Sequence, residues 1–302
     1  MELIVQPDAG AGPIDRILRR AKVSIDLCIF RFDHKSIERE LALAVQRGVR
    51  VRALIAHAVG RRAIKLRKLE DQLLDAGVMV ARTPDDLLRY HSKFMVVDDT
   101  LHLFGFNFTK SDIKQCRSFG IATRHRKSVQ EALRLFEADC TRRSYAPSAA
   151  SNLVVSPLSA RPVLEKFLRA ARRDLAIYDA RVRDPSMIRI LHERARKGVL
   201  VRVLGKMAKA NGTIVVRPMK GLRLHVRAII RDGTASFVGS QSLRRQELDK
   251  RREVGLIIGN PGVTRALKRV FESDWEAAAP AKEKQPEEKP GRPAESLEGM
   301  TG

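Results

Sequence analysis

An internal repeat constrains the fold of this chain more than any other feature of its sequence. The stretch LIVQPDAGAGPIDRILRRAKVSIDLCIFRFD, from Leu3, has the same pattern as LVVSPLSARPVLEKFLRAARRDLAIYDARVRD, from Leu153. Each shows an apolar strand, a proline, an amphipathic helix, a second apolar strand and then an aspartate. A unit that occurs twice in one chain predicts two similar halves that pack against each other.

Later landmarks repeat in the same order but at a shorter spacing. RGVRVRALI (47–55) returns 150 residues later as KGVLVRVLG (197–205), whereas a histidine motif at position 91 returns only 134 residues later. Between these landmarks the first copy has a helical pattern that ends at a glycine, RRAIKLRKLEDQLLDAG (61–77), and the second copy has only KMAKANG. We therefore expect the second half to lack one helix.

Short apolar segments alternate with helical patterns along both copies. Each copy reads strand, helix, strand, helix, strand, then three further strands and a closing helix. This alternation predicts an α/β fold in which each half has a mixed sheet flanked by helices. We expect the halves at residues 1–148 and 149–277. Residues 278–302 are rich in Pro, Glu, Lys and Gly without apolar periodicity, which predicts a disordered tail.

The chain carries a net charge of +23, from 58 Lys or Arg against 35 Asp or Glu. The predicted tail holds four of the basic residues and five of the acidic ones, so residues 1–277 alone carry +24. Such a charge favours an anionic partner: nucleic acid, an anionic membrane surface or a phosphorylated small molecule. A surface that is basic only for solubility is the alternative.

The expected location follows from what the chain lacks. No apolar run approaches the roughly 20 residues of a membrane span, and the start, MELIVQPDAG, has no signal-peptide pattern. Three cysteines, an odd number without metal-type spacing, suit a reducing compartment. We expect a cytoplasmic protein whose contact with a membrane, if any, is peripheral. Because both halves lie in one chain, a monomer would hold a complete site.

The segment HSKFMVVDD (91–99) contains a histidine, a lysine two residues later and an aspartate. In a strand, side chains alternate, so His91 and Lys93 would share one face and Asp98 would lie on the other. An imidazole beside a cation suits a phosphate, because the cation holds the anionic oxygens while the imidazole reaches phosphorus. Asp98 is better explained as a structural acid that ties down the end of the strand.

The segment HVRAIIRDG (225–233) has the same spacing, with His225, Arg227 and Asp232 in the corresponding places. Arg227 keeps the positive charge and can bind phosphate through two N–H groups, and Asp232 would be a structural acid like Asp98. If a pseudo-twofold axis relates the halves, the two His/cation pairs face each other across one cleft. One histidine then attacks phosphorus while the other protonates the leaving oxygen, and no metal is required.

With glycine loops behind them, the paired motifs resemble those of the phospholipase D superfamily, notably its cardiolipin synthase-like members, over residues 1–276. The resemblance implies one active site between two α/β halves and no cofactor. It also implies that His91 is the nucleophile and His225 the general acid, with Lys93 and Arg227 binding phosphate. Exchange of the two histidine roles stays open.

The loops behind the motifs depart from the family pattern. FGFNFT (104–109) lacks one residue of the G-S-x-N loop, and VGSQSL (238–243) has a serine in place of the asparagine. The resemblance implies that three side chains here donate to phosphate oxygens: Asn107, Ser240 and Ser242.

A glutamate that orients the imidazole is a further trait of the family. Glu253, 28 residues after His225, stands where members tend to carry it, so it would hydrogen-bond His225. In the first half the aligned residue is Ser118.

Together these features predict a metal-independent phosphodiesterase or phosphatidyltransferase that acts through a phosphohistidine at His91. We favour a phospholipid-like phosphodiester as the substrate. One alternative is a nuclease of the same superfamily, and another is a catalytically silent module that binds anionic lipid or nucleic acid. The fold resemblance does not choose among them, because one scaffold hosts several substrates.

Overall fold

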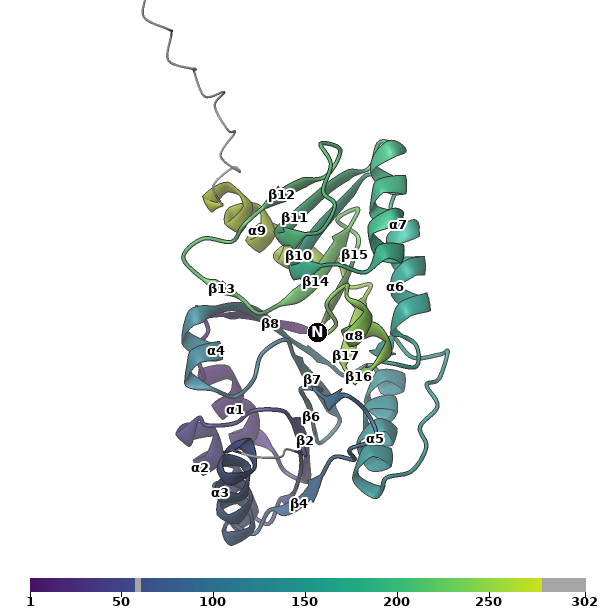
Figure 1. Ribbon diagram of the computed structural model, residues 1–302. Coiled ribbons are helices and arrows are strands. Elements are labelled where there is room, and N and C mark those ends of the chain that lie inside the picture. The colour runs from purple at the N-terminus through teal and green to yellow at the C-terminus, as the bar shows by residue number, and fades with distance from the viewer. Residues whose placement is uncertain (58–60, 279–302) are drawn as a thin grey trace, which may run out of the picture.

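The structure is a computed structural model that describes residues 1–57 and 61–278. It has two halves, one above the other in Figure 1, each a mixed β-sheet with helices on its faces. The predicted α/β fold with two similar halves is thereby confirmed. Residues 279–302, nearly all of the predicted disordered tail, lie outside the described residues. In the part of the chain that is described, no helix is both long and apolar enough to cross a membrane.

The sheet of the N-terminal half follows a path of seven strands. Their order is β1 (Glu2–Gln6), β8 (Cys116–Thr123), β7 (Thr100–Phe104), β6 (Phe94–Val97), β2 (Ser24–Ile29), β3 (Arg50–Ile55) and β4 (Met79–Arg82). One face is covered by α1 (Gly12–Arg20), α2 (Lys35–Gln46) and α3 (Arg61–Asp75), and the other by α5 (Arg126–Thr141). Strand residues alternate between these two faces, since Leu27 packs with the α1–α3 side and Cys28 with the α5 side.

The C-terminal half repeats this order strand for strand. The path is β9 (Leu153–Val155), β17 (Val254–Ile258), β15 (Ala235–Gly239), β14 (Arg227–Arg231), β10 (Asp174–Val182), β11 (Leu200–Met207) and β12 (Val215–Arg217). Its longer helices are α6 (Ala160–Arg169), α7 (Pro185–Arg196) and α9 (Pro261–Ala277). Residues 208–214, all described, contain no helix where the first half has α3, so the predicted loss of one helix is confirmed.

Local sequence explains where α7 begins. The Asp184 side chain accepts hydrogen bonds from the N–H groups of Ser186 and Met187, and a proline follows it, so α7 starts there. Two short helices, α4 (Lys110–Gln115) and α8 (Arg245–Asp249), were not predicted. With six and five residues they are too short to display a helical period.

A shared apolar core joins the two halves. It contains side chains of α5 and α9 and of both sheets. At its centre the ring of Tyr178 makes edge-to-face contacts with two phenylalanine rings. The ring centroids lie 5.5 Å apart for Phe119 of the first half and 5.1 Å apart for Phe271. The halves therefore share buried apolar surface, which favours their fixed association.

Two short strand pairings cross from one half to the other. β5 (Arg89–Tyr90) pairs in parallel with β16 (Arg251–Arg252). β13 (Arg223–Leu224) pairs in parallel with Cys116 and Arg117 at the start of β8, as Figure 1 indicates. Each crossing strand ends directly before a motif histidine, so both motifs are anchored at the boundary between the halves.

The motif segments are only partly strands. β6 begins at Phe94 and β14 at Arg227, so both histidines lie before the strand and not within it. The prediction of one continuous strand was wrong here, because the preceding residues pair with the other half. At the far end, Asp98 and Asp232 have φ angles of 52° and 55° and turn the chain.

Both motif aspartates bind backbone N–H groups of the neighbouring strand. Asp98 accepts from Val23 at 2.8 Å and from Ser24 at 3.0 Å. Asp232 accepts from Arg173 at 2.7 Å and from Asp174 at 3.1 Å. These bonds lower the pKa of both carboxyls, against the opposing effect of their partial burial.

A buried ion pair also ties the halves together. The Arg117 guanidinium donates to both carboxylate oxygens of Asp274, at 2.8 and 3.0 Å, and the Tyr178 hydroxyl donates to the same carboxylate at 2.6 Å. The carbonyl of Arg117 accepts from the N–H of His225 at 3.2 Å. This pair thus supports the crossing strand that leads to His225.

We expect Asp274→Asn to lower the free energy of unfolding by about 3–5 kcal/mol, because it removes the buried countercharge of the Arg117 guanidinium. The carboxylate that remains near Arg117, that of Asp8 at 3.2 Å, is exposed to solvent. Urea denaturation followed by circular dichroism measures this change. The control is Asp99→Asn. The Asp99 carboxylate is 77% exposed, and its ion pair with Arg124, at 3.7 Å, is long. It should change stability by less than about 0.5 kcal/mol. Similar small losses in both variants would contradict the prediction.

Candidate active site

The charged side chains of the two motifs gather in one cluster between the halves. Burial lowers the pKa of His91 well below its ordinary value, and the charges of Lys93 and of Arg227, from the other half, lower it further. Burial also lowers the pKa of His225, to about 3, and Lys93, Arg227 and His91 all contribute in the same direction. Each motif therefore acts electrostatically on the histidine of the other, as a site shared by both halves requires.

His91 is held by a carboxylate from the opposite half. Its Nδ1 lies 2.9 Å from Oε2 and 3.1 Å from Oε1 of Glu253, which is fully buried. Its backbone N–H donates to the carbonyl of Arg252 at 2.7 Å, so the pairing of β5 with β16 sets this contact. Lys93 Nζ lies 3.1 Å from both ring nitrogens and donates to the His91 carbonyl at 2.8 Å.

The expected pairing of Glu253 with His225 is wrong. Glu253 follows the crossing strand β16, which runs beside β5 of the first half, so its side chain reaches His91. The resemblance to the family, applied through the 28-residue spacing, had assigned the glutamate to the histidine of its own half.

The protonation of this pair follows from burial. Burial raises the pKa of Glu253 to about 7, with Lys93 among the charges that oppose the rise, and burial lowers the pKa of Lys93 to about 8. Since the pKa of His91 is also lowered, its imidazole is neutral at neutral pH. We assign the proton to Nδ1, which donates to Glu253, so that Nε2 keeps its lone pair.

An aromatic side chain packs beside His91. The ring of Phe30 lies edge-on to the imidazole, with centroids 4.7 Å apart. The guanidinium groups of Arg31 and Arg89 lie 5.5 and 5.4 Å from the Phe30 centroid. The matching position in the second half is Ala180, so His91 has an aromatic neighbour at this position and His225 does not.

His225 also faces a carboxylate from the opposite half, Asp112. Nδ1 of His225 lies 3.4 Å from Oδ2 of Asp112, without the alignment of a hydrogen bond. The same carboxylate accepts from the N–H and the Nδ2 of Asn107, at 3.0 and 2.6 Å, and from Arg223 at 2.7 Å. Burial would raise the pKa of Asp112, but His225 and these donors hold it below its usual value.

Sequence reasoning missed Asp112. Its signal was available: Gly105 matches Gly239 at the 134-residue offset of the two histidines, whereas Gly120 matches Gly255 at an offset of 135, so a one-residue gap follows Gly105. With this gap, Asp112 aligns with Glu247 and Ser118 with Glu253. Because Ser118 has no charge to offer His225, Asp112 on α4 is the nearby acid that the first half contributes.

Arg227 also comes with an acid that sequence reasoning missed. Its Nε lies 3.8 Å from Oδ1 of Asp179, and its NH1 donates to the His225 carbonyl at 2.7 Å. The position that matches Asp179 in the first half is Ile29. A Cβ at Gly205 would stand 1.8 Å from the Asp179 carbonyl oxygen, so only glycine fits beside this acid.

The loop side chains expected to donate to phosphate are bound to protein groups. Asn107 donates to Asp112 at 2.6 Å. Ser240 accepts from the N–H of Val254 at 3.2 Å, and the Ser242 hydroxyl donates to Asp179. Phosphate contacts from Asn107, Ser240 and Ser242 therefore stay predictions.

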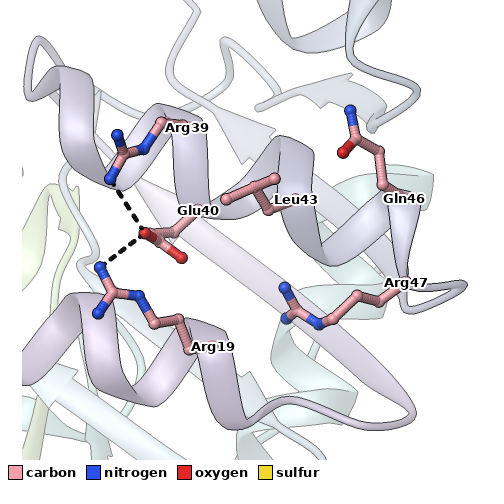
Figure 2. A pocket seen from close by; sticks show the side chains of 6 residues that line it. All are labelled: Arg19, Arg39, Glu40, Leu43, Gln46 and Arg47. Carbon is pink, nitrogen blue, oxygen red and sulfur yellow. Dashed lines mark hydrogen bonds and ion pairs between the residues drawn. The ribbon is translucent and has the colours of Figure 1, made fainter.

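A separate basic pocket of about 460 Å³ opens on the outer surface between α1 and α2 (Figure 2). At its centre the buried Glu40 accepts from Arg19 at 2.9 Å and lies 3.6 Å from Arg39. This ion pair holds α1 against α2. None of the motif residues lines the pocket.

Within residues 1–57 and 61–278, no three His, Cys, Asp or Glu side chains gather as a metal site. The cluster instead offers two imidazoles, each beside a carboxylate, and two cations. Such a set can bind an anion, attack it with one imidazole and exchange a proton through the other.

A family model described as "Cardiolipin synthase, PLD-like domain" matches residues 14–140 and 164–275, which include both motifs. Human mitochondrial cardiolipin hydrolase is 32% identical over 135 residues, which cover 42% of this chain and 51% of that protein. The match thus spans about half the length of this curated relative.

Solved structures share the fold across both halves. Polyphosphate kinase from Porphyromonas gingivalis superposes with a TM-score of 0.76 at 17% identity, covering 91% of this chain and 50% of that one. Phosphatidylserine synthase from Haemophilus influenzae Rd KW20 gives a TM-score of 0.66 at 14% identity, covering 91% and 85%. At these identities the likeness concerns the fold alone.

If His225 acts as an acid, Asp112→Asn should weaken it. The Asp112 charge raises the pKa of His225, so its loss leaves less imidazolium at a given pH. We expect the fall of kcat at high pH to begin about one pH unit lower. A pH profile of single-turnover rates measures this shift, with Asp99→Asn as the control. A uniform loss of rate with an unchanged profile would contradict the prediction.

Proposed function

The chain belongs to the phospholipase D superfamily, and on that premise we propose that it cleaves a phosphodiester through a phosphohistidine at His91, without a metal. The observation that carries this proposal is the bond between His91 Nδ1 and Glu253, at 2.9 Å. A carboxylate that accepts a hydrogen bond from Nδ1–H keeps the proton on Nδ1 and leaves the lone pair of Nε2 free for nucleophilic attack. The superfamily match supports an enzyme that acts on phosphodiesters.

In the first step His91 Nε2 forms a bond to phosphorus, and the bond from phosphorus to the leaving ester oxygen breaks. That oxygen takes the proton of the His225 imidazolium. Burial disfavours the charged form of His225, but a bound phosphodiester anion and Asp112 both favour it. Lys93 and Arg227 would hold the two non-bridging oxygens and offset the charge that develops on them.

In the second step an acceptor oxygen attacks phosphorus and the bond to His91 Nε2 breaks. The neutral His225 left by the first step takes the proton of the acceptor. Water as the acceptor gives hydrolysis, and an alcohol gives phosphatidyl transfer. One pair of imidazoles thus serves both directions of proton transfer.

A phospholipid-like phosphodiester is the substrate that we propose. The description of the matching family and the name of the human relative both refer to cardiolipin. A nuclease is the second candidate, favoured by the +24 charge of residues 1–277, which would also attract a nucleic-acid backbone. A silent binding module would not need a carboxylate beside each imidazole.

A chromogenic aryl diester separates the two histidine roles, because its phenolate leaves without an acid. We expect His225→Ala to release about one equivalent of phenolate per enzyme and to accumulate phosphohistidine. His91→Ala should release none and lose roughly 10⁴-fold or more in kcat. Rapid-quench kinetics and mass spectrometry detect the burst and the adduct. The control is His125→Ala, which replaces an exposed histidine directly before α5.

The opposite pattern, with the adduct on His225, would exchange the assigned roles. An absence of any adduct together with full activity of His91→Ala would refute the mechanism. The substrate is tested in buffer with a chelator, on phospholipid vesicles and on single- and double-stranded DNA. Cleavage of DNA alone would select the nuclease.

A further inference from the structure

The two carboxylates beside the imidazoles are not held alike. Glu253 lies 2.9 Å from His91, and the nearest arginine, Arg251, stays 4.0 Å from it and binds Glu247 at 3.0 Å. Oδ2 of Asp112 lies 3.4 Å from Nδ1 of His225 without the alignment of a hydrogen bond, and other donors bind this carboxylate. Glu253 thus makes a hydrogen bond with its histidine, whereas Asp112 makes hydrogen bonds with Asn107 and Arg223.

Arg223 is the charged donor that competes with His225 for Asp112, since the donor groups of Asn107 are neutral. Its NH2 donates to Oδ1 of Asp112 at 2.7 Å, and its Nε donates to the sulfur of Cys116 at 3.3 Å. Arg223 sits on the crossing strand β13, two residues before His225. β13 therefore carries the cation that draws the carboxylate away, and it leads directly into the imidazole.

Arg223 is also within reach of an anion from solvent. Its side chain is 62% exposed, whereas that of Asp112 is only 5% exposed. An exposed guanidinium binds phosphate oxygens through two parallel N–H groups, as it binds a carboxylate. A phosphate that engages Arg223 would compete with Asp112 for the same donors.

We propose that Arg223 is a positioning residue that holds the Asp112 carboxylate away from His225, and that an anion competing for Arg223 lets this carboxylate close on the imidazole. Binding of the substrate and protonation of the acid are then coupled. The coupling explains how an imidazole that is neutral among cations becomes an acid when the diester binds. Its catalytic consequence rests on the proposed function, but the coupling of the side chains does not.

The charges that face His225 come from several elements. Asp112 of α4 favours its charged form, whereas Lys93 and His91, just before β6, and Arg227 of β14 disfavour it. Cys116 of β8 contacts Arg223 and not the imidazole. Asp112 is thus the anion whose position decides the balance.

The test measures the His225 titration directly, by NMR of ¹³C-labelled histidine, with His225→Asn assigning the resonance. We expect Arg223→Gln to raise the pKa of His225 by about one unit, because Asp112 is released to it. Arg223→Lys, which keeps the charge but not the two-pronged grip, should raise it less. Inorganic phosphate should raise the wild-type pKa by more than it raises that of Arg223→Gln.

A double-mutant cycle separates positioning from simple charge removal. In the Asp112→Asn background, Arg223→Gln should no longer shift the titration. Arg89→Gln removes the arginine at the matching place, two residues before His91, and should leave the His225 titration unchanged. A shift that persists without Asp112, or equal titrations in wild type and Arg223→Gln, would overturn the proposal.

Kinetics supply the second reading. The pH profile of kcat/KM reports the free enzyme and that of kcat the bound complex. In Arg223→Gln, the fall of kcat/KM at high pH should therefore begin at a higher pH than in wild type. The fall of kcat should begin at the same pH in both. If no diester is cleaved by any variant, the proposed function fails while the NMR result still decides the coupling.

Discussion

The exchange of short strands between the halves is the constraint on which the rest of the structure depends. The N–H of His91 donates to the carbonyl of Arg252, and the N–H of His225 donates to that of Arg117. Each histidine is therefore placed by backbone of the other half, and each faces a carboxylate from that half. A half folded alone would hold a histidine but neither its anchoring carbonyl nor its acid.

The repeated backbone carries unequal chemistry. His91 has a buried glutamate within hydrogen-bond distance and an aromatic ring at its edge, which suits a neutral nucleophile. His225 shares its aspartate with Arg223, which suits an imidazole that must change its protonation during the reaction. The two motif cations also differ in their surroundings. Arg227, which replaces the lysine of the first motif, lies 3.8 Å from Asp179, and the first half has Ile29 at the position that matches this aspartate.

Much of the fold was predictable, because the apolar periods, the glycine loops and the repeat are local patterns. They predicted both α/β halves and the loss of a helix between β11 and β12. They also singled out the histidines and cations that meet in the cluster. The short helices α4 and α8 and the crossing strands escaped, because elements of two to six residues leave no period to detect.

The sequence by itself determined which side chains carry the chemistry and that they occur twice, since composition and spacing are properties of the chain. Only the tertiary structure decided which carboxylate serves which imidazole. Glu253 is 28 residues from His225 and 162 from His91, yet it binds His91. The reason is physical: a hydrogen bond depends on distance in space, and the crossing of β16 beside β5 brings the more distant residue closer.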